Sequence, residues 1–139
     1  MAPVPVRFVR SVLTRAATLP EVAARVPEAR RDVAVRITSD EEMAQLNRTY
    51  ADVADATDVL SFAGVGEHLG DIALSWPAIE RQADRFGHDA RTELALLSVH
   101  GLLHLLGWDH AMARERREMT RLTLAALALS RIAPAEGRL

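Results

Sequence analysis

The sequence contains neither cysteine nor lysine. Without cysteine, disulfide bonds and metal sites built on thiolates are excluded, and a cytoplasmic location is permitted. No apolar run reaches the length that spans a bilayer, and residues 1–7 lack the apolar segment of a secretory signal. We therefore expect a cytoplasmic protein with no membrane partner.

A large charge of one sign is also lacking, since the net charge of the 139 residues is −2. This value gives no overall attraction for nucleic acid, but residues 1–36 carry a balance of +4 and the remainder −6. The basic N-terminal part could guide an RNA backbone, although an ordinary solvated surface explains the distribution as well. With 49% hydrophobic residues the chain can bury a core, which predicts a single domain over residues 1–139.

Short apolar segments, several of them alternating with polar residues, predict four strands, at residues 4–9, 33–37, 59–62 and 69–76. We expect the last two to be joined through residues 64–66. Strands gathered early and helices later indicate an α+β fold, in which helices cover a small mixed sheet of about four strands.

Proline, glycine and capping residues predict the helices. We expect a helix over residues 12–26 that Pro20 interrupts or shortens, and a short helix to about residue 50 that a capping box opens. The box consists of Ser39 and Glu42. A later helix over residues 77–86 is expected to begin with Pro77 and to end near Gly87. The next helix is expected to be capped by Asp89. A last amphipathic helix is expected to bury Met119, Leu122, Ala126 and Leu129.

Three of the five histidines lie within residues 100–110. The apolar run before them predicts a helix, and a spacing of four puts His100 and His104 on one face, about 6 Å apart along the axis. A continuous helix would turn His110 roughly 120° away from His104. The chain must therefore break between them, and Gly107 stands where a left-handed residue can end the helix.

Three imidazoles that leave one tetrahedral position open predict a catalytic zinc site on this central helix. Ordinary buried histidines are the alternative, which the surrounding leucines disfavour because unpaired buried imidazoles cost free energy. Zinc is the expected ion, although cobalt, nickel and copper also bind imidazoles. In zinc peptidases with this spacing a glutamate follows the first histidine as general base, and here Gly101 stands there. Asp109 is expected either to orient a ligand or to form a turn.

The string HGLLHLLGWDH at residues 100–110 resembles the signature of the YbeY family of bacterial endoribonucleases. Two further stretches resemble the family pattern, the first at residues 46–50 followed by 57–62, and the second at residues 69–75. Three matches in the same order extend the resemblance from residue 46 to residue 110.

The resemblance implies a single metal-dependent hydrolase domain with one Zn²⁺ held by His100, His104 and His110, which are also its catalytic residues. It further implies single-strand-specific, zinc-dependent endoribonuclease activity in 16S rRNA 3′-end maturation and ribosome quality control. The partners would be ribosomal RNA and ribosomal particles, with no DNA expected.

The sequence departs from the family pattern near the tyrosine of the first stretch. The family has an arginine implicated in RNA cleavage where this sequence has Ala51, and an acidic residue where it has Ala54. A proline expected after the Ser-Phe pair is replaced by Ala63. Arg48, one helical turn before Ala51, could contact RNA in place of the lost arginine, or it is an ordinary surface arginine.

Further substrate contacts are considered for Asp109 and for His68, which could line the mouth of the active site, and surface positions are the alternative. His88 is expected at the surface. Asp71 is expected either to orient a metal ligand or to bond the backbone. Thr57, Asp58 and Ser61 are expected to order a loop or line the cleft.

Two alternatives to the RNA-cleaving enzyme remain at this point. The ligand spacing is also that of zinc hydrolases of peptide or amide bonds, which Gly101 disfavours. A non-catalytic ribosome assembly factor with structural zinc is disfavoured because structural zinc usually has four protein ligands, and it is favoured by Ala51.

Overall fold

The computed structural model describes residues 6–49, 59–109 and 111–139, and three strands form one sheet in it. The strand order is β1-β3-β2, with β1 parallel and β2 antiparallel to β3. The sheet is therefore mixed, as the sequence predicts. The strands are β1 (Asp32–Thr38), β2 (Val59–Ala63) and β3 (His68–Ser75).

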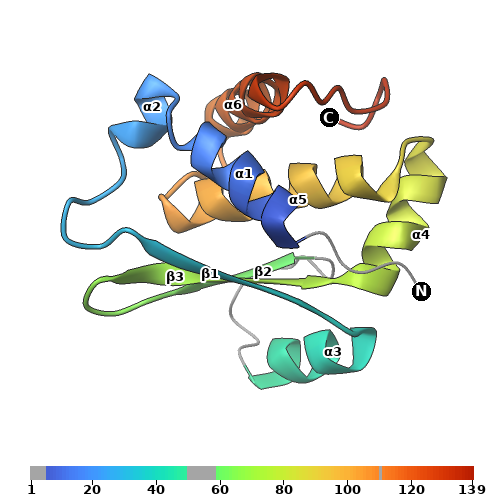
Figure 1. Ribbon diagram of the computed structural model, residues 1–139, viewed down its shortest axis with the longest axis horizontal. Coiled ribbons are helices and arrows are strands. Elements are labelled where there is room, and N and C mark those ends of the chain that lie inside the picture. The colour runs from blue at the N-terminus through green and yellow to red at the C-terminus, as the bar shows by residue number, and fades with distance from the viewer. Residues whose placement is uncertain (1–5, 50–58, 110) are drawn as a thin grey trace.

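Helices cover both faces of this sheet, which gives a layered α+β fold (Figure 1). Helix α3 lies on one face, and helices α1 and α5, with α6 beyond them, lie over the other. The six helices are α1 (Val6–Ala16), α2 (Pro20–Ala23), α3 (Asp40–Thr49), α4 (Trp76–Phe86), α5 (Ala90–Leu105) and α6 (Ala113–Leu129).

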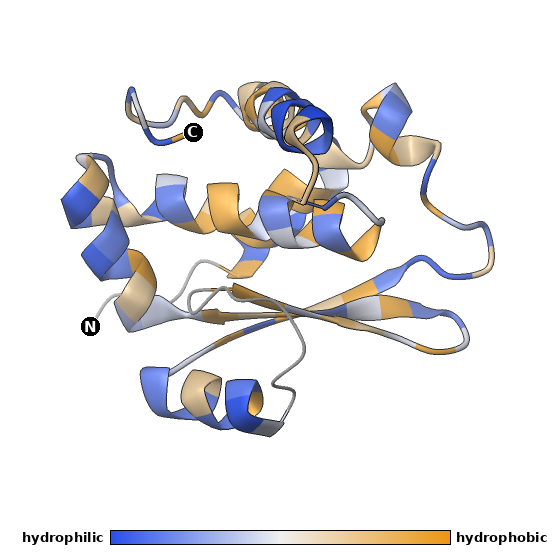
Figure 2. Ribbon diagram, turned by 180° about the vertical axis from the view of Figure 1, so that it is seen from behind, coloured by the Kyte–Doolittle hydropathy of each residue, from blue (hydrophilic) through white to orange (hydrophobic). Residues whose placement is uncertain are grey.

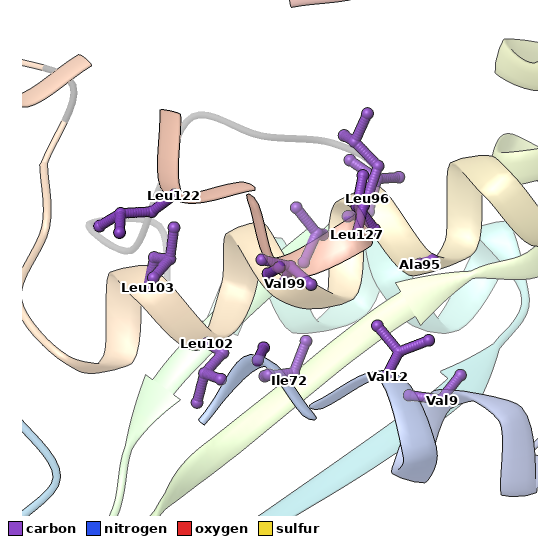
Figure 3. Packing of buried hydrophobic residues seen from close by; sticks show 14 of the residues in the cluster. Val9, Val12, Ile72, Ala95, Leu96, Val99, Leu102, Leu103, Leu122 and Leu127 are labelled. Atoms are coloured by element: carbon purple, nitrogen blue, oxygen red, sulfur yellow. The ribbon is translucent and has the colours of Figure 1, made fainter. Parts of the chain in front are cut away.

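Helix α5 is the centre of the packing, because α1, α4, α6 and the strands β2 and β3 all contact it. All residues from Glu93 to Val99 are buried, so the helix is enclosed on every side over this stretch. Figure 2 shows hydrophobic residues along much of α5 and the sheet, and hydrophilic residues on α3. Figure 3 shows the core where Ile72 of β3 and Val12 of α1 meet Val99 and Leu102 of α5. A helix that the core encloses gives any side chain at its end a fixed position.

The predicted strand at residues 4–9 is wrong where the structure describes it, because residues 6–9 begin α1. Val9, Val12 and Ala16 are all buried, and they repeat at helical spacing. The alternation of Val4, Val6 and Phe8 is shorter than this helical pattern, which extends over 11 residues. The described sheet has three strands instead of about four for this reason.

The predicted interruption at Pro20 is confirmed, because α1 ends at Ala16 and Pro20 begins a new helix, α2, at the position where its missing N–H is not needed. The last helix differs from its prediction at one position. Leu129 is 45% exposed, and Leu127 is buried in its place beside Met119, Leu122 and Ala126. The predicted buried position at the end of this helix, residue 129, is therefore wrong, and residue 127 is the buried one.

Several local signals are confirmed. The Ser39 hydroxyl accepts a hydrogen bond from the Glu42 N–H at 3.2 Å, although the Glu42 carboxylate bonds Arg36 instead of closing the box. Helix α4 ends at Gly87, whose φ is +80°. Asp89 caps α5 by accepting from the Thr92 N–H at 2.8 Å. The cap at the beginning of α5 and the glycine that ends α4 were therefore predictable from the sequence.

None of the helices in the described ranges combines the length and the apolar character that crossing a membrane requires.

Candidate metal centre

The last two turns of α5 bring two histidines together. The ring centroids of His100 and His104 are 5.2 Å apart, with the ring planes tilted by 57°. Both side chains are half-buried, so they border the core and remain accessible. The predicted juxtaposition of these two imidazoles on one helix face is confirmed.

A hydrogen bond to the backbone sets the orientation of His104. Its Nδ1 lies 3.0 Å from the carbonyl oxygen of Trp108. Because a carbonyl oxygen only accepts, Nδ1 must carry the proton and donate, and the lone pair is then on Nε2. Metal-binding histidines in proteins usually have this arrangement, in which one ring nitrogen donates to the protein and the other binds the ion.

The turn at the end of α5 positions the carbonyl of Trp108. The Trp108 N–H donates to the Leu103 carbonyl at 3.0 Å, and the Gly107 N–H donates to the His104 carbonyl at 3.0 Å. These two bonds form a Schellman motif, and Gly107 occupies its left-handed position with φ +98°. Leu103 and Trp108 are buried together at this end of the helix. The break after α5 that Gly107 was predicted to make is confirmed.

We predict that Gly107→Val weakens zinc binding about tenfold or more, because a β-branched residue is strained at this positive φ and displaces the Trp108 carbonyl. The measurement is zinc affinity by competition with a chromophoric chelator. Gly87→Val is the matched control, since Gly87 ends α4 with φ +80° and a side chain there meets open space. A Gly107→Val protein with wild-type zinc affinity would show that the turn does not position a ligand.

The third expected ligand, His110, lies outside the described residues. Within the ranges that are described, no three histidine or carboxylate side chains gather as a metal site. Asp109, which directly precedes His110 in the sequence, is exposed and accepts a hydrogen bond from the Ala111 N–H at 3.1 Å. This contact supports the turn-forming alternative for Asp109.

Gly101 packs its backbone directly against the sheet. A Cβ atom at this position would lie 2.8 Å from Cγ2 of Ile72 in β3, closer than such atoms approach. The Gly101 carbonyl also accepts a hydrogen bond from the Ser61 hydroxyl of β2 at 3.2 Å. A glutamate directly after His100 therefore has no room, and the absence of a peptidase-type base has a structural cause.

His68 and Asp71 pair with each other at the beginning of β3. His68 Nε2 lies 3.0 Å from Asp71 Oδ1, and the two side chains are 34% and 51% exposed. Asp71 thus orients a histidine, but this histidine is none of the three predicted ligands.

Arg48 lies in the last turn of α3 and is exposed. Helix α3 and the histidine-bearing α5 lie on opposite faces of the sheet (Figure 1). The structure therefore does not bring Arg48 together with His100 and His104. Arg48 was considered because it lies one helical turn before Ala51, and Ala51 is outside the described part of the chain. Ala54, Thr57 and Asp58 are also outside it.

The prediction of a surface position for His88 is wrong. Its side chain is 8% exposed, its Nδ1 accepts from the Ala135 N–H at 2.9 Å, and its Nε2 lies 2.7 Å from Glu93 Oε1. Arg138 donates from Nε and Nη2 to the same carboxylate at 3.0 and 2.7 Å. Burial alone would raise the pKa of Glu93, but the bonds from Arg138 and His88 outweigh it and hold this pKa below its usual value. The C-terminal segment is anchored by this cluster.

Sequence reasoning also missed Trp108 and Glu118. The indole Nε1 of Trp108 donates to Glu118 Oε1 at 2.9 Å, while its backbone carbonyl bonds His104. The two residues are ten positions apart, and no short motif signals their contact. Only the position of Trp108 inside the histidine string could have drawn attention to it.

The structure is therefore that of a layered α+β protein with a candidate metal site at the end of its central helix. The sequence model of the family described as Endoribonuclease YbeY matches residues 6–130. A relative from Roseiflexus castenholzii, named Endoribonuclease YbeY, is 42% identical over 115 residues, which cover 72% of each chain. One from Chloroflexus aggregans with the same name is 42% identical over 135 residues, covering 82% of this chain and 88% of its own. The chain belongs to the YbeY family.

A solved structure is similar in fold. The solution structure of a protein from Thermotoga maritima aligns with a TM-score of 0.59 over 94% of this chain and 88% of its own, at 19% sequence identity. This likeness supports the fold of the chain.

Proposed function

We propose that this protein is a zinc-dependent endoribonuclease that cleaves single-stranded RNA, with ribosomal RNA as its substrate. Membership of a family whose relatives are named endoribonucleases supports the reaction class. We extend the proposal to maturation of the 16S rRNA 3′ end and ribosome quality control in the cytoplasm, with ribosomal particles as partners.

The observation that carries the metal part of the proposal is the orientation of His104. With Nδ1 donating to the Trp108 carbonyl, Nε2 carries the lone pair that would bind an ion, and the His100 ring lies 5.2 Å away. Neutral imidazoles are donors that suit zinc. The residues present therefore fit a zinc ion, and His100, His104 and His110 would hold it. When bound, zinc supplies a Lewis acid for the phosphoryl oxygens of RNA and for water.

The chain's own residues contribute positioning. The Schellman turn and the Trp108 carbonyl hold the His104 ring, and the buried turns of α5 hold the backbone that carries both histidines. The Ser61 hydroxyl and Ile72 fix Gly101 between them, so that α5 lies against the sheet at the site. Preorganised ligands of this kind lose little conformational freedom when an ion binds.

The substrate contacts remain proposals for His68, Asp109 and Arg48. The first two are accessible, and Asp109 directly precedes a proposed ligand. Arg48 belongs to α3, which covers the face of the sheet opposite to α5. An RNA cleavage rate that Arg48→Ala leaves unchanged would remove Arg48 from the mechanism.

Substrate profiling tests the reaction class. Zinc-loaded protein should cleave a single-stranded RNA, leave a duplex of the same sequence largely intact, and leave a peptide library untouched. Cleavage of peptides without cleavage of RNA would favour the peptidase alternative, which the packing of Gly101 against Ile72 argues against. Zinc-loaded protein that binds ribosomal particles but cleaves no RNA would favour an assembly factor.

A further inference from the structure

We propose that Arg25 is a positioning residue of the metal centre: it clamps the turn after α5 and thereby holds His104 in its metal-binding orientation. The inference rests on the proposed zinc site. Arg25 lies 83 positions before Trp108 in the sequence, just after α2, and no motif connects it with the histidines.

Arg25 contacts the turn at two points. Its guanidinium carbon lies 3.7 Å from the centroid of the Trp108 ring, and its Nη1 donates to the Leu106 carbonyl at 3.4 Å. The first contact is a cation–π stack, and the second satisfies one of the last carbonyls of α5, which no helical N–H reaches. Both contacts fall on the residues that flank Gly107.

Trp108 is the residue through which this clamp acts on His104. The indole is 2% exposed, with the guanidinium of Arg25 over its ring and Glu118 Oε1 accepting from Nε1 at 2.9 Å. The carbonyl of the same residue accepts from His104 Nδ1. Because two side chains hold the indole ring, Trp108 cannot rotate freely, and its backbone carbonyl stays directed at the His104 imidazole.

The chemistry of arginine suits this double contact. A planar guanidinium can stack on an aromatic face while an N–H at its edge donates in plane, whereas the ammonium of lysine is a point charge. A cation at the C-terminus of α5 also interacts favourably with the partial negative charge of the helix end. Arg25 therefore stabilises the turn and orients its carbonyl at once.

The two effects of Arg25 on a bound cation have opposite signs. As a positive charge near the site it disfavours a zinc ion, so its removal on electrostatic grounds alone would strengthen zinc binding. As a clamp on Trp108 it favours the ion by keeping the proton on Nδ1 of His104, so that the lone pair is on Nε2. The sign of the change in zinc affinity therefore distinguishes the two roles.

The test measures Arg25→Ala in two ways. We expect its zinc affinity, from chelator competition, to fall about tenfold, at the weak end of the range for outer contacts of a metal site. In the metal-free protein near pH 8, where imidazoles are neutral, ¹⁵N resonances of His104 should show the Nδ1–H tautomer in wild type and a mixture of both tautomers in the variant. Arg25→Lys, which keeps the charge and loses the planar stack, should lie between the two.

Arg30→Ala is the matched control. Arg30 is an exposed arginine five positions later whose Nε donates to the Gly66 carbonyl at 2.9 Å, so its loss removes the same charge and one bond to a carbonyl. It should leave zinc affinity and the tautomer unchanged. Unchanged or tighter zinc binding in Arg25→Ala, with His104 still in the Nδ1–H tautomer, would overturn the proposal. If wild-type protein binds no zinc, the proposed function fails, and the tautomer comparison alone then decides whether Arg25 orients His104.

Discussion

His104→Ala is expected to lower zinc affinity more than about 100-fold and to abolish zinc-dependent RNA cleavage, because it removes a proposed ligand and not only a contact that orients one. The side chain is half-buried at the end of α5, so the leucine-rich core around the helix remains. We expect circular dichroism of the metal-free variant to match wild type. The first measurement is the zinc content of the variant and of wild type after dialysis, by elemental analysis.

His68→Ala is the matched control for the zinc measurement, since His68 is also half-exposed and its partner is Asp71 at the beginning of β3. It should retain one zinc ion per chain. A His104→Ala protein that keeps a full equivalent of zinc at wild-type affinity would contradict the three-histidine site.

Arg138→Ala is expected to lower the free energy of unfolding by about 3–5 kcal/mol, because it leaves the charge of Glu93 buried without its main partner. The Glu93 side chain is 0% exposed, and Arg138 gives it two of its three hydrogen bonds from side chains. The third comes from His88, whose other ring nitrogen bonds the Ala135 N–H. Urea unfolding monitored by circular dichroism measures the effect.

Arg36→Ala is the control, because it also breaks an arginine–glutamate pair. Arg36 and Glu42 are 68% and 32% exposed, and such a pair contributes less than about 1 kcal/mol. Equal losses in the two variants would show that the buried cluster does not anchor the C-terminal segment.

The lowered pKa of Glu93 also predicts how stability depends on pH. A carboxyl whose folded pKa lies below its unfolded value of 4.5 contributes stability that is complete above pH 4.5 and is lost as the pH falls through the folded pKa. Glu93→Gln should therefore flatten the decline of the unfolding free energy below pH 4.5. An unchanged acid slope would show that Glu93 is not a source of this acid sensitivity.

The parts of the fold that sequence could predict are those set by local chemistry. Asp89 and Gly107 determine the two ends of α5 through a side-chain cap and a left-handed turn, and both were readable from residue type and position. The spacing of His100 and His104 likewise determines that their rings lie together on one face.

The parts that sequence could not predict depend on contacts between distant segments. Val6 to Val9 alternate in a way that fits a strand, and only packing against α5 and α6 shows that the longer helical pattern of α1 prevails. His88 looked like a surface residue because its partners, the Ala135 backbone and Glu93, are 47 and 5 positions away. Arg25 reaches Trp108 across most of the chain, and charge or composition gives no sign of such a stack.

The proposed zinc site is tested most directly by comparing wild-type protein with His100→Ala in cleavage of single-stranded ribosomal RNA, after zinc content has been measured for both. We expect that wild type carries one zinc ion and cleaves the RNA, that a chelator abolishes cleavage and added zinc restores it, and that His100→Ala neither holds zinc nor cleaves. Zinc-loaded wild type that leaves the RNA intact, or equal cleavage by His100→Ala, would contradict the central claim that these histidines form a zinc site for RNA cleavage.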